Sequence, residues 1–171
     1  RWDDRTSASS DRVSEPAHPY HPSVWLSGDP TIGEGTWIGA FCVIDGSGGL
    51  EIGRGCDVSS GVQIYTHSSA KRCVSGRAYP EVERAPTTIG DHVFIGAGSI
   101  INMGVTIGSS SVIGAGSVVT KDIEPLSVVA GVPARVIGRV HLDGNDVAFE
   151  MFSAPVDTVE PSFDAVKSER S

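Results

Sequence analysis

The stretch IGSSSVIGAGSVVTKD, residues 107–122, has a period that belongs to neither an α-helix nor an ordinary strand. Apolar residues return every six positions, and a small residue often follows each of them. A helix facing a core repeats near 3.6 residues and a half-buried strand near 2. A period of six therefore indicates internal repeats of the hexapeptide kind.

The same period covers much of the chain. One run has an apolar residue every six positions at Ile89, Ile95, Ile101, Ile107, Ile113 and Val119. An earlier run comprises Leu26, Ile32, Ile38 and Ile44, and then, after a shift of two residues, Ile52, Val58 and Ile64. The shift falls in the glycine-rich sequence GSGG at residues 46–49.

A second inward position follows each apolar residue by four places and holds small or medium side chains such as Cys42, Ser99 and Ser117. Glycine is frequent three places after the apolar residue, where a tight turn with positive φ requires it. This pattern predicts a short strand, a corner and another short strand. Three such units make one coil, and the coils stack by parallel pairing about 4.8 Å apart. Periodicity leaves the handedness open, since parallel crossovers generally favour the right-handed sense.

The period is interrupted once within the 171 residues and is absent from both ends. The polar stretch 68–88 breaks the period and predicts a projecting loop, because long loops in compact domains tend to be functional or disordered. The ends, 1–25 and 143–171, lack periodicity and are expected to be irregular tails around a single domain at 26–142. The C-terminal tail holds seven acidic and two basic side chains out of a chain whose net charge is −8.

Composition excludes several classes of function. An acidic chain without a basic stripe is a poor nucleic-acid binder, so no nucleic-acid partner is expected. No apolar run approaches the roughly 20 residues that cross a bilayer, so membrane insertion is not expected either. Three cysteines at irregular spacing form no disulfide framework, which favours reduced thiols and a cytoplasmic location.

Residues 85–140 resemble the C-terminal half of the hexapeptide-repeat acyltransferases, above all in IGAGSVVTKDI and VVAGVPARVI within residues 113–137. The resemblance covers about residues 26–140. It implies an all-β fold, a left-handed parallel β-helix of triangular cross-section, usually assembled as a homotrimer with active sites between subunits. It also implies transfer of an acetyl group from acetyl-CoA to sugars, nucleotide sugars, serine or some antibiotics.

The catalytic candidate is His67 in IYTHSS, residues 64–69, where these enzymes place their catalytic histidine before a projecting loop. A hydroxyl attacks a thioester poorly until a base removes its proton, and an imidazole with a pKa near 6.5 suits that task. The competing interpretation is an ordinary exposed loop residue. The loop carboxylates Glu81 and Glu83 are candidates for orienting the ring or for binding the acceptor, although such carboxylates are more often simply solvated.

Five residues match family positions that contact the donor, acetyl-CoA. The resemblance assigns the backbone amides of Ala97 and Ala115 to the pantetheine arm, Thr120 and Lys121 to the nucleotide end, and Arg135 to the 3′-phosphate. Two cations would supply local charge complementarity that the acidic chain lacks overall. Solvated rim residues are the alternative.

The acceptor is expected to be a sugar hydroxyl, because GSGG, IYTHSS and the loop look closest to acetyltransferases of O-antigen, capsule or other polysaccharide assembly. An amine on a nucleotide amino sugar is the first alternative, since a histidine base serves both nucleophiles. A non-catalytic scaffold or a zinc-dependent hydratase of the same fold is the second. A zinc site needs three converging histidines, and only His67 and His92 lie in suitable coils, so no metal is expected.

Overall fold

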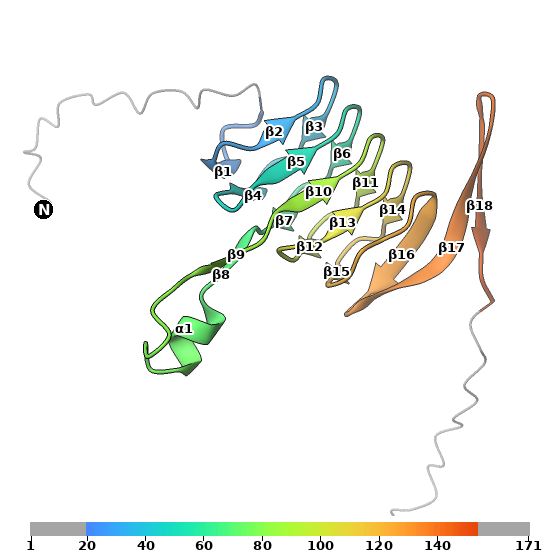
Figure 1. Cartoon of the computed structure of the whole chain (residues 1–171). Coiled ribbons are helices and arrows are strands. Elements are labelled where there is room, and N and C mark those ends of the chain that lie inside the picture. The colour runs from blue at the N-terminus through green and yellow to red at the C-terminus, as the bar shows by residue number, and fades with distance from the viewer. Residues whose placement is uncertain (1–19, 154–171) are drawn as a thin grey trace, which may run out of the picture.

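The computed structural model describes residues 20–153, which wind into a three-sided column of parallel strands (Figure 1). Strands that follow one another along the chain lie on different faces, and each pairs with strands one coil earlier and one coil later. The coils turn in the left-handed sense, against the usual preference of parallel crossovers (Figure 1). The predicted left-handed parallel β-helix is confirmed.

Three sheets form the faces, which we call faces A, B and C. Face A contains, in spatial order, β1 (Trp25–Gly28), β4 (Val43–Gly46), β7 (Gln63–Ile64), β12 (Ile100–Ile101) and β15 (Val118–Val119). Face B contains β2 (Thr31–Ile32), β5 (Leu50–Ile52), β10 (Thr87–Ile89) and β13 (Thr106–Ile107). Face C begins with β3 (Trp37–Ile38), β6 (Asp57–Val58), β11 (Phe94–Ile95) and β14 (Val112–Ile113), followed by β16 (Ser127–Gly131), β17 (Ala134–Asp143) and β18 (Asp146–Met151).

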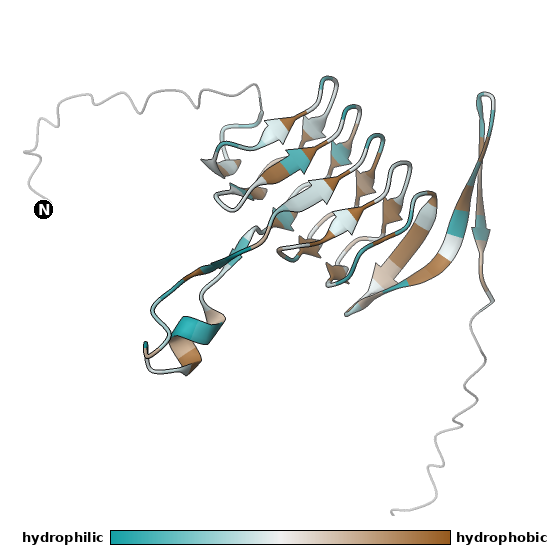
Figure 2. Ribbon diagram, in the orientation of Figure 1, coloured by the Kyte–Doolittle hydropathy of each residue, from teal (hydrophilic) through white to brown (hydrophobic). Residues whose placement is uncertain are grey.

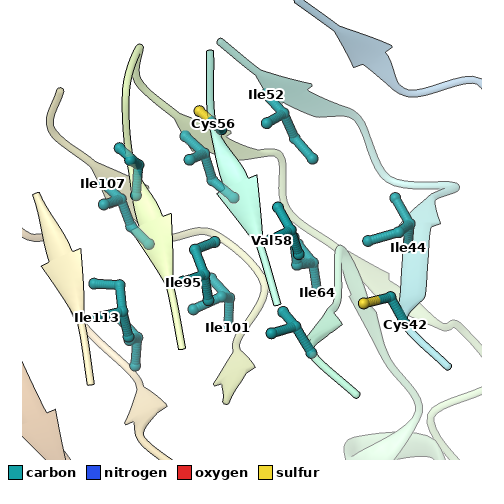
Figure 3. Packing of buried hydrophobic residues seen from close by; sticks show 14 of the residues in the cluster. Cys42, Ile44, Ile52, Cys56, Val58, Ile64, Ile95, Ile101, Ile107 and Ile113 are labelled. Carbon is teal, nitrogen blue, oxygen red and sulfur yellow. The ribbon is translucent and has the colours of Figure 1, made fainter. Parts of the chain in front are cut away.

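The core is a set of stacked aliphatic columns. Pairing keeps equivalent residues in register, so that Ile44 lies beside Ile64, which lies beside Ile101. Figure 3 shows these side chains filling the interior together with Cys42 and Cys56, which occupy the small inward position. Figure 2 shows hydrophobic residues on the strands of the coils and again on β16 and β17. Burial of the six-residue pattern confirms its interpretation as the inward face of a coil.

The projecting loop is more ordered than a simple connection. It leaves the column through β8 (His67–Ser68), forms the short helix α1 (Ala70–Val74), and returns through β9 (Glu83–Arg84), which pairs with β8 in an antiparallel ladder. Figure 1 shows this segment standing away from the coils.

The expected tail boundaries differ from the structure at both ends. Val24 is buried in the core and β1 begins at Trp25, so the column starts before residue 26. Residues beyond 142 were expected to be irregular, but β17 and β18 form an antiparallel hairpin that extends face C to Met151. The hairpin alternates in polarity, with Val147 and Phe149 on one side and the His141–Glu150 ion pair on the other. Residues 1–19 and 154–171 of the expected tails lie outside the described residues.

Ile107→Ala in β13 tests the column core. Its side chain is buried whereas Thr106 in the same strand is exposed, so Ile107→Ala should cost about 2–5 kcal/mol of unfolding free energy and Thr106→Ala less than about 1. Urea unfolding midpoints measure both. Equal losses for the two variants would contradict the assignment of inward and outward positions.

Candidate active site

His67 stands at the point where the projecting loop leaves the column. It is the first residue of β8 and pairs with Arg84 of β9, so the antiparallel ladder fixes its backbone. About a third of its side chain, 37%, is exposed, which leaves the imidazole anchored yet accessible.

Asp45 at the end of β4 holds the imidazole. Its carboxylate Oδ2 lies 2.6 Å from His67 Nδ1, and its side chain is fully buried. The same oxygen accepts hydrogen bonds from the backbone N–H and the hydroxyl of Thr66, at 2.9 and 3.0 Å. Oδ1 accepts a hydrogen bond of 3.0 Å from the backbone N–H of Ser47. The carboxylate therefore has a partner on both oxygens.

These hydrogen bonds determine the charge of Asp45. Burial by itself raises the pKa of a carboxyl group, because it disfavours the charged form. The hydrogen bonds from Ser47, Thr66 and His67 outweigh burial and hold the Asp45 pKa well below its usual range. Asp45 is consequently ionised throughout the neutral pH range.

The ionised carboxylate fixes the tautomer of His67. A carboxylate only accepts hydrogen bonds, so Nδ1 must carry the proton and donate it to Asp45. Nε2, at the far side of the ring, is then left with a lone pair that can accept a proton. A buried carboxylate behind a partly exposed imidazole also stabilises the cation that forms when the ring takes up that proton.

The shift in the repeat at GSGG builds this arrangement. Gly46 ends β4, and residues 47–49 form the corner that follows it and folds over Thr66, where the Gly48 N–H donates to the Thr66 hydroxyl at 2.8 Å. A Cβ on Gly48 would lie 2.2 Å from the Thr66 carbonyl oxygen, so a larger residue cannot approach as closely. Ser47 of the same corner places its hydroxyl 3.3 Å from His67 Nδ1.

Sequence reasoning missed Asp45. It named Glu81 and Glu83 as carboxylates that could orient His67, but Glu83 forms an ion pair with Lys71 within the loop and Glu81 is exposed. The available signal was a single acidic residue directly after the inward Ile44, beside the two-residue shift in the repeat.

The five donor candidates occupy two separate edges of the column. Thr120 and Lys121 lie at the corner between faces A and B, the A–B corner, two strands of face A beyond the level of His67. Ala97 and Ala115 lie in the turns between faces C and A, the C–A corner. Arg135 lies in β17 and pairs with Ala130 near the end of β16, so it lies on the side of face C next to the C–A corner. All five are exposed.

Face A therefore separates the two groups within one chain. His67, Thr120 and Lys121 line its A–B edge, whereas Ala97, Ala115 and Arg135 line its C–A edge. A single copy does not bring them together in one site.

Two negative observations apply to the described part of the chain only. Within residues 20–153, no three His, Cys, Asp or Glu side chains converge in a way that could hold a metal ion. Over the same residues, no helix has the length and apolar character that crossing a membrane requires.

The comparisons with known proteins identify the class to which this three-sided parallel β-helix belongs. A family model described as the hexapeptide repeat of succinyl-transferase matches residues 31–66 and 86–121. The chain is similar to nodulation protein L of Rhizobium meliloti (strain 1021), with 47% identity over 108 residues, 63% of this chain and 58% of that protein. It is also similar to the galactoside O-acetyltransferase of Escherichia coli (strain K12), with 37% identity over 65% of this chain and 64% of that one.

Solved structures of similar fold are also acyltransferases. A maltose O-acetyltransferase from Clostridium difficile 630 is 35% identical over 70% of this chain and 67% of its own, with a TM-score of 0.54. A variant of AntD, an N-acyltransferase from Bacillus cereus in complex with dTDP and coenzyme A, is 30% identical over 68% and 67%, with a TM-score of 0.61. The chain belongs to the hexapeptide-repeat acetyltransferase family. It spans about 60% of the length of the first two relatives.

Asp45→Asn should change the acid sensitivity of the fold. The lowered Asp45 pKa contributes stability that is present above the unfolded value of about 3.9 and is lost as the pH falls from there toward the folded value. The urea midpoint of the natural protein should therefore fall more steeply between about pH 5 and pH 2 than that of Asp45→Asn. Asp29→Asn, at an exposed position, is the control and should keep the natural slope. Parallel curves for all three proteins would contradict the account.

Proposed function

We propose that this protein is an acetyl-CoA-dependent acetyltransferase that acetylates a hydroxyl of a sugar or polysaccharide precursor, with His67 as the general base. The observation that carries the proposal is the 2.6 Å contact between His67 Nδ1 and the buried carboxylate of Asp45. Membership of the family and the O-acetyltransferases among the similar proteins support the reaction class.

The reaction needs one proton carrier and no acyl-enzyme. His67 Nε2 takes the proton of the acceptor hydroxyl while the oxygen attacks the thioester carbon, giving a tetrahedral oxyanion. A backbone N–H stabilises this oxyanion, and that of Ala97 is the candidate. The carbon–sulfur bond then breaks, and the departing CoA thiolate takes the proton from the imidazolium. Asp45 is a positioning residue, because it acts on the reaction through the ring.

The donor would run along the C–A edge. The amides of Ala97 and Ala115 on this edge are assigned to the pantetheine arm and Arg135 to the 3′-phosphate. Thr120 and Lys121, on the A–B edge of the adjacent copy, are assigned to the nucleotide end. Local positive charge matters here because the chain as a whole carries −8. The use of acetyl-CoA and the three free thiols suit a cytoplasmic location.

The assembly follows from the division of the site between two edges. We infer a homotrimer in which the A–B edge of one copy meets the C–A edge of the next, so that face A of each copy turns toward the threefold axis. The outward row of face A supports this, since four of its five residues are apolar, namely Trp25, Val43, Ile100 and Val118 but not Gln63. The outward row of face B holds Thr31, Glu51, Thr88 and Thr106. A largely apolar outer row suits burial between subunits.

N-acetylation of a nucleotide amino sugar is the second candidate. The observation that favours it is the likeness to AntD, whose structures contain dTDP and dTDP-4-amino-4,6-dideoxyglucose. The same imidazole can accept a proton from an amine. An acceptor screen with acetyl-CoA that includes maltose, a methyl galactoside, a nucleotide amino sugar and serine separates the two candidates through thiol release.

His67→Ala should remove transfer and leave donor binding intact. We expect kcat to fall by about 10²–10⁴-fold, with the calorimetric Kd for CoA within about twofold of the natural value. His141→Ala, in the C-terminal hairpin far along face C, is the control and should keep full activity. Natural turnover in His67→Ala would remove the mechanism. Absence of CoA binding in the natural protein, or stoichiometric zinc in it, would favour the scaffold or hydratase alternative.

Co-expression of two inactive variants tests the shared site. His67→Ala lacks the base, and Ala115→Trp blocks the donor edge, so each trimer alone should be inactive. In every mixed trimer, one of the three interfaces combines the natural His67 of one copy with the natural Ala115 of its neighbour, which should restore about a third of the natural activity per site. No restored activity in purified mixed trimers would place both groups in the site of one chain.

A further inference from the structure

Two large aromatic side chains lie at the first C–A corner of the column. Trp37 on face C flanks this corner and Phe41 occupies it, and they are 55% and 72% exposed. Trp37 leans over the corner, since the end of its ring would lie 3.0 Å from a Cβ on Gly39. We call these two residues the aromatic platform. Large exposed aromatic groups that gather in one place usually mark a binding surface.

The backbone of Phe41 holds its ring outward in a conformation that favours glycine. Equivalent positions of the next three C–A turns are Gly61, Gly98 and Gly116, with φ of 73°, 69° and 69°, whereas Phe41 has φ of 61°. A bulky residue in this region costs energy and is retained where surrounding structure enforces it. Here the Phe41 N–H donates to Ser23 Oγ at 2.8 Å, and Ser23 Oγ lies 2.8 Å from His21 Nδ1.

Polar groups lie one coil further along the same edge. Asp57 pairs with Trp37 across face C and is exposed, and Ser60 is exposed in the next C–A turn. Aromatic rings next to a carboxylate and a hydroxyl match a pyranose ring, which offers an apolar C–H face for stacking and hydroxyl groups along its rim.

The order of the coils along the column places the aromatic platform one coil before His67. The turn of Phe41 precedes β4, and His67 follows β7, the next strand of face A. The turns of Ala97 and Ala115 precede β12 and β15, which lie on the other side of β7. Adjacent levels are about 4.8 Å apart. A donor that lies along Ala115 and Ala97 approaches the coil of His67 from its C-terminal side. The N-terminal side, where the aromatic platform lies, is then free for the acceptor.

We propose that the aromatic platform binds the pyranose ring of the acceptor, in the site where the base is His67 of a neighbouring copy. This proposal rests on the proposed function and the threefold arrangement given above. Trp37 and Phe41 stack on the C–H face, while Asp57 and Ser60 bind hydroxyls. The platform thereby selects ring sugars over small linear acceptors.

Binding to the CoA-loaded protein provides the test. Maltose and methyl β-D-galactopyranoside are titrated with saturation-transfer NMR, which reports which sugar protons contact the protein. At least one should bind through C–H protons, and Trp37→Ala and Phe41→Ala should weaken that binding by about tenfold. Trp37→Phe should restore most of the affinity. Phe149→Ala, an exposed aromatic position on the hairpin, is the matched control and should bind as the natural protein does.

Separate readouts distinguish the possible failures. The platform proposal is overturned if neither pyranoside binds, or if both alanine variants bind them normally. It is also overturned if the alanine variants lose the trimer by light scattering, because the rings would then serve as a subunit contact. Acetyl transfer to serine that needs His67 but is insensitive to Trp37→Ala and Phe41→Ala would leave the enzyme reaction standing and remove the sugar platform alone. Lack of CoA binding would instead refute the proposed function.

Discussion

The parallel, in-register stacking of coils is the constraint on which the rest of the structure depends. Each inward aliphatic residue lies beside its equivalent in the next coil, as Ile64 does beside Ile44 and Ile101. Burial of these columns compensates the conformational entropy of ordering many short strands, none of which could persist alone. The same stacking also turns every corner position into a straight column along the axis. The position of any functional side chain on the column is therefore given by its coil and by the edge on which it lies.

This arrangement explains why the candidate site has its present form. The corners are the places where the chain can deviate without breaking the stack, and the two largest deviations, GSGG and the projecting loop, occur at the A–B edge in successive coils. Together they bury Asp45 and raise His67 at the loop base. Of the groups assigned to the donor, Ala97, Ala115 and Arg135 lie on the other edge of face A from His67, so the proposed site requires another copy of the column to pack against this one.

Much of the fold could be predicted from the sequence, because a period of six residues has few structural solutions. The coils, their inward residues and the loop all follow from local spacing, whereas His67 was selected because IYTHSS resembles the segment that carries the catalytic histidine in hexapeptide-repeat acyltransferases. Asp45 could not be predicted, since its contact with His67 joins residues 22 positions apart and depends on the two-residue shift at GSGG. The C-terminal hairpin was missed because its six-residue strand β18 is exposed throughout and lies in an acidic segment. The unusual backbone conformation of Phe41 was also not predicted, because its positive φ is visible only in the structure.

A structure of the protein with bound CoA tests the central claim most directly. The account predicts a threefold assembly in which CoA lies between copies, its sulfur within hydrogen-bonding reach of the His67 ring of one copy and its pantetheine arm along Ala97 and Ala115 of the next. CoA bound along the surface of a single copy, with its sulfur remote from every His67, would contradict it.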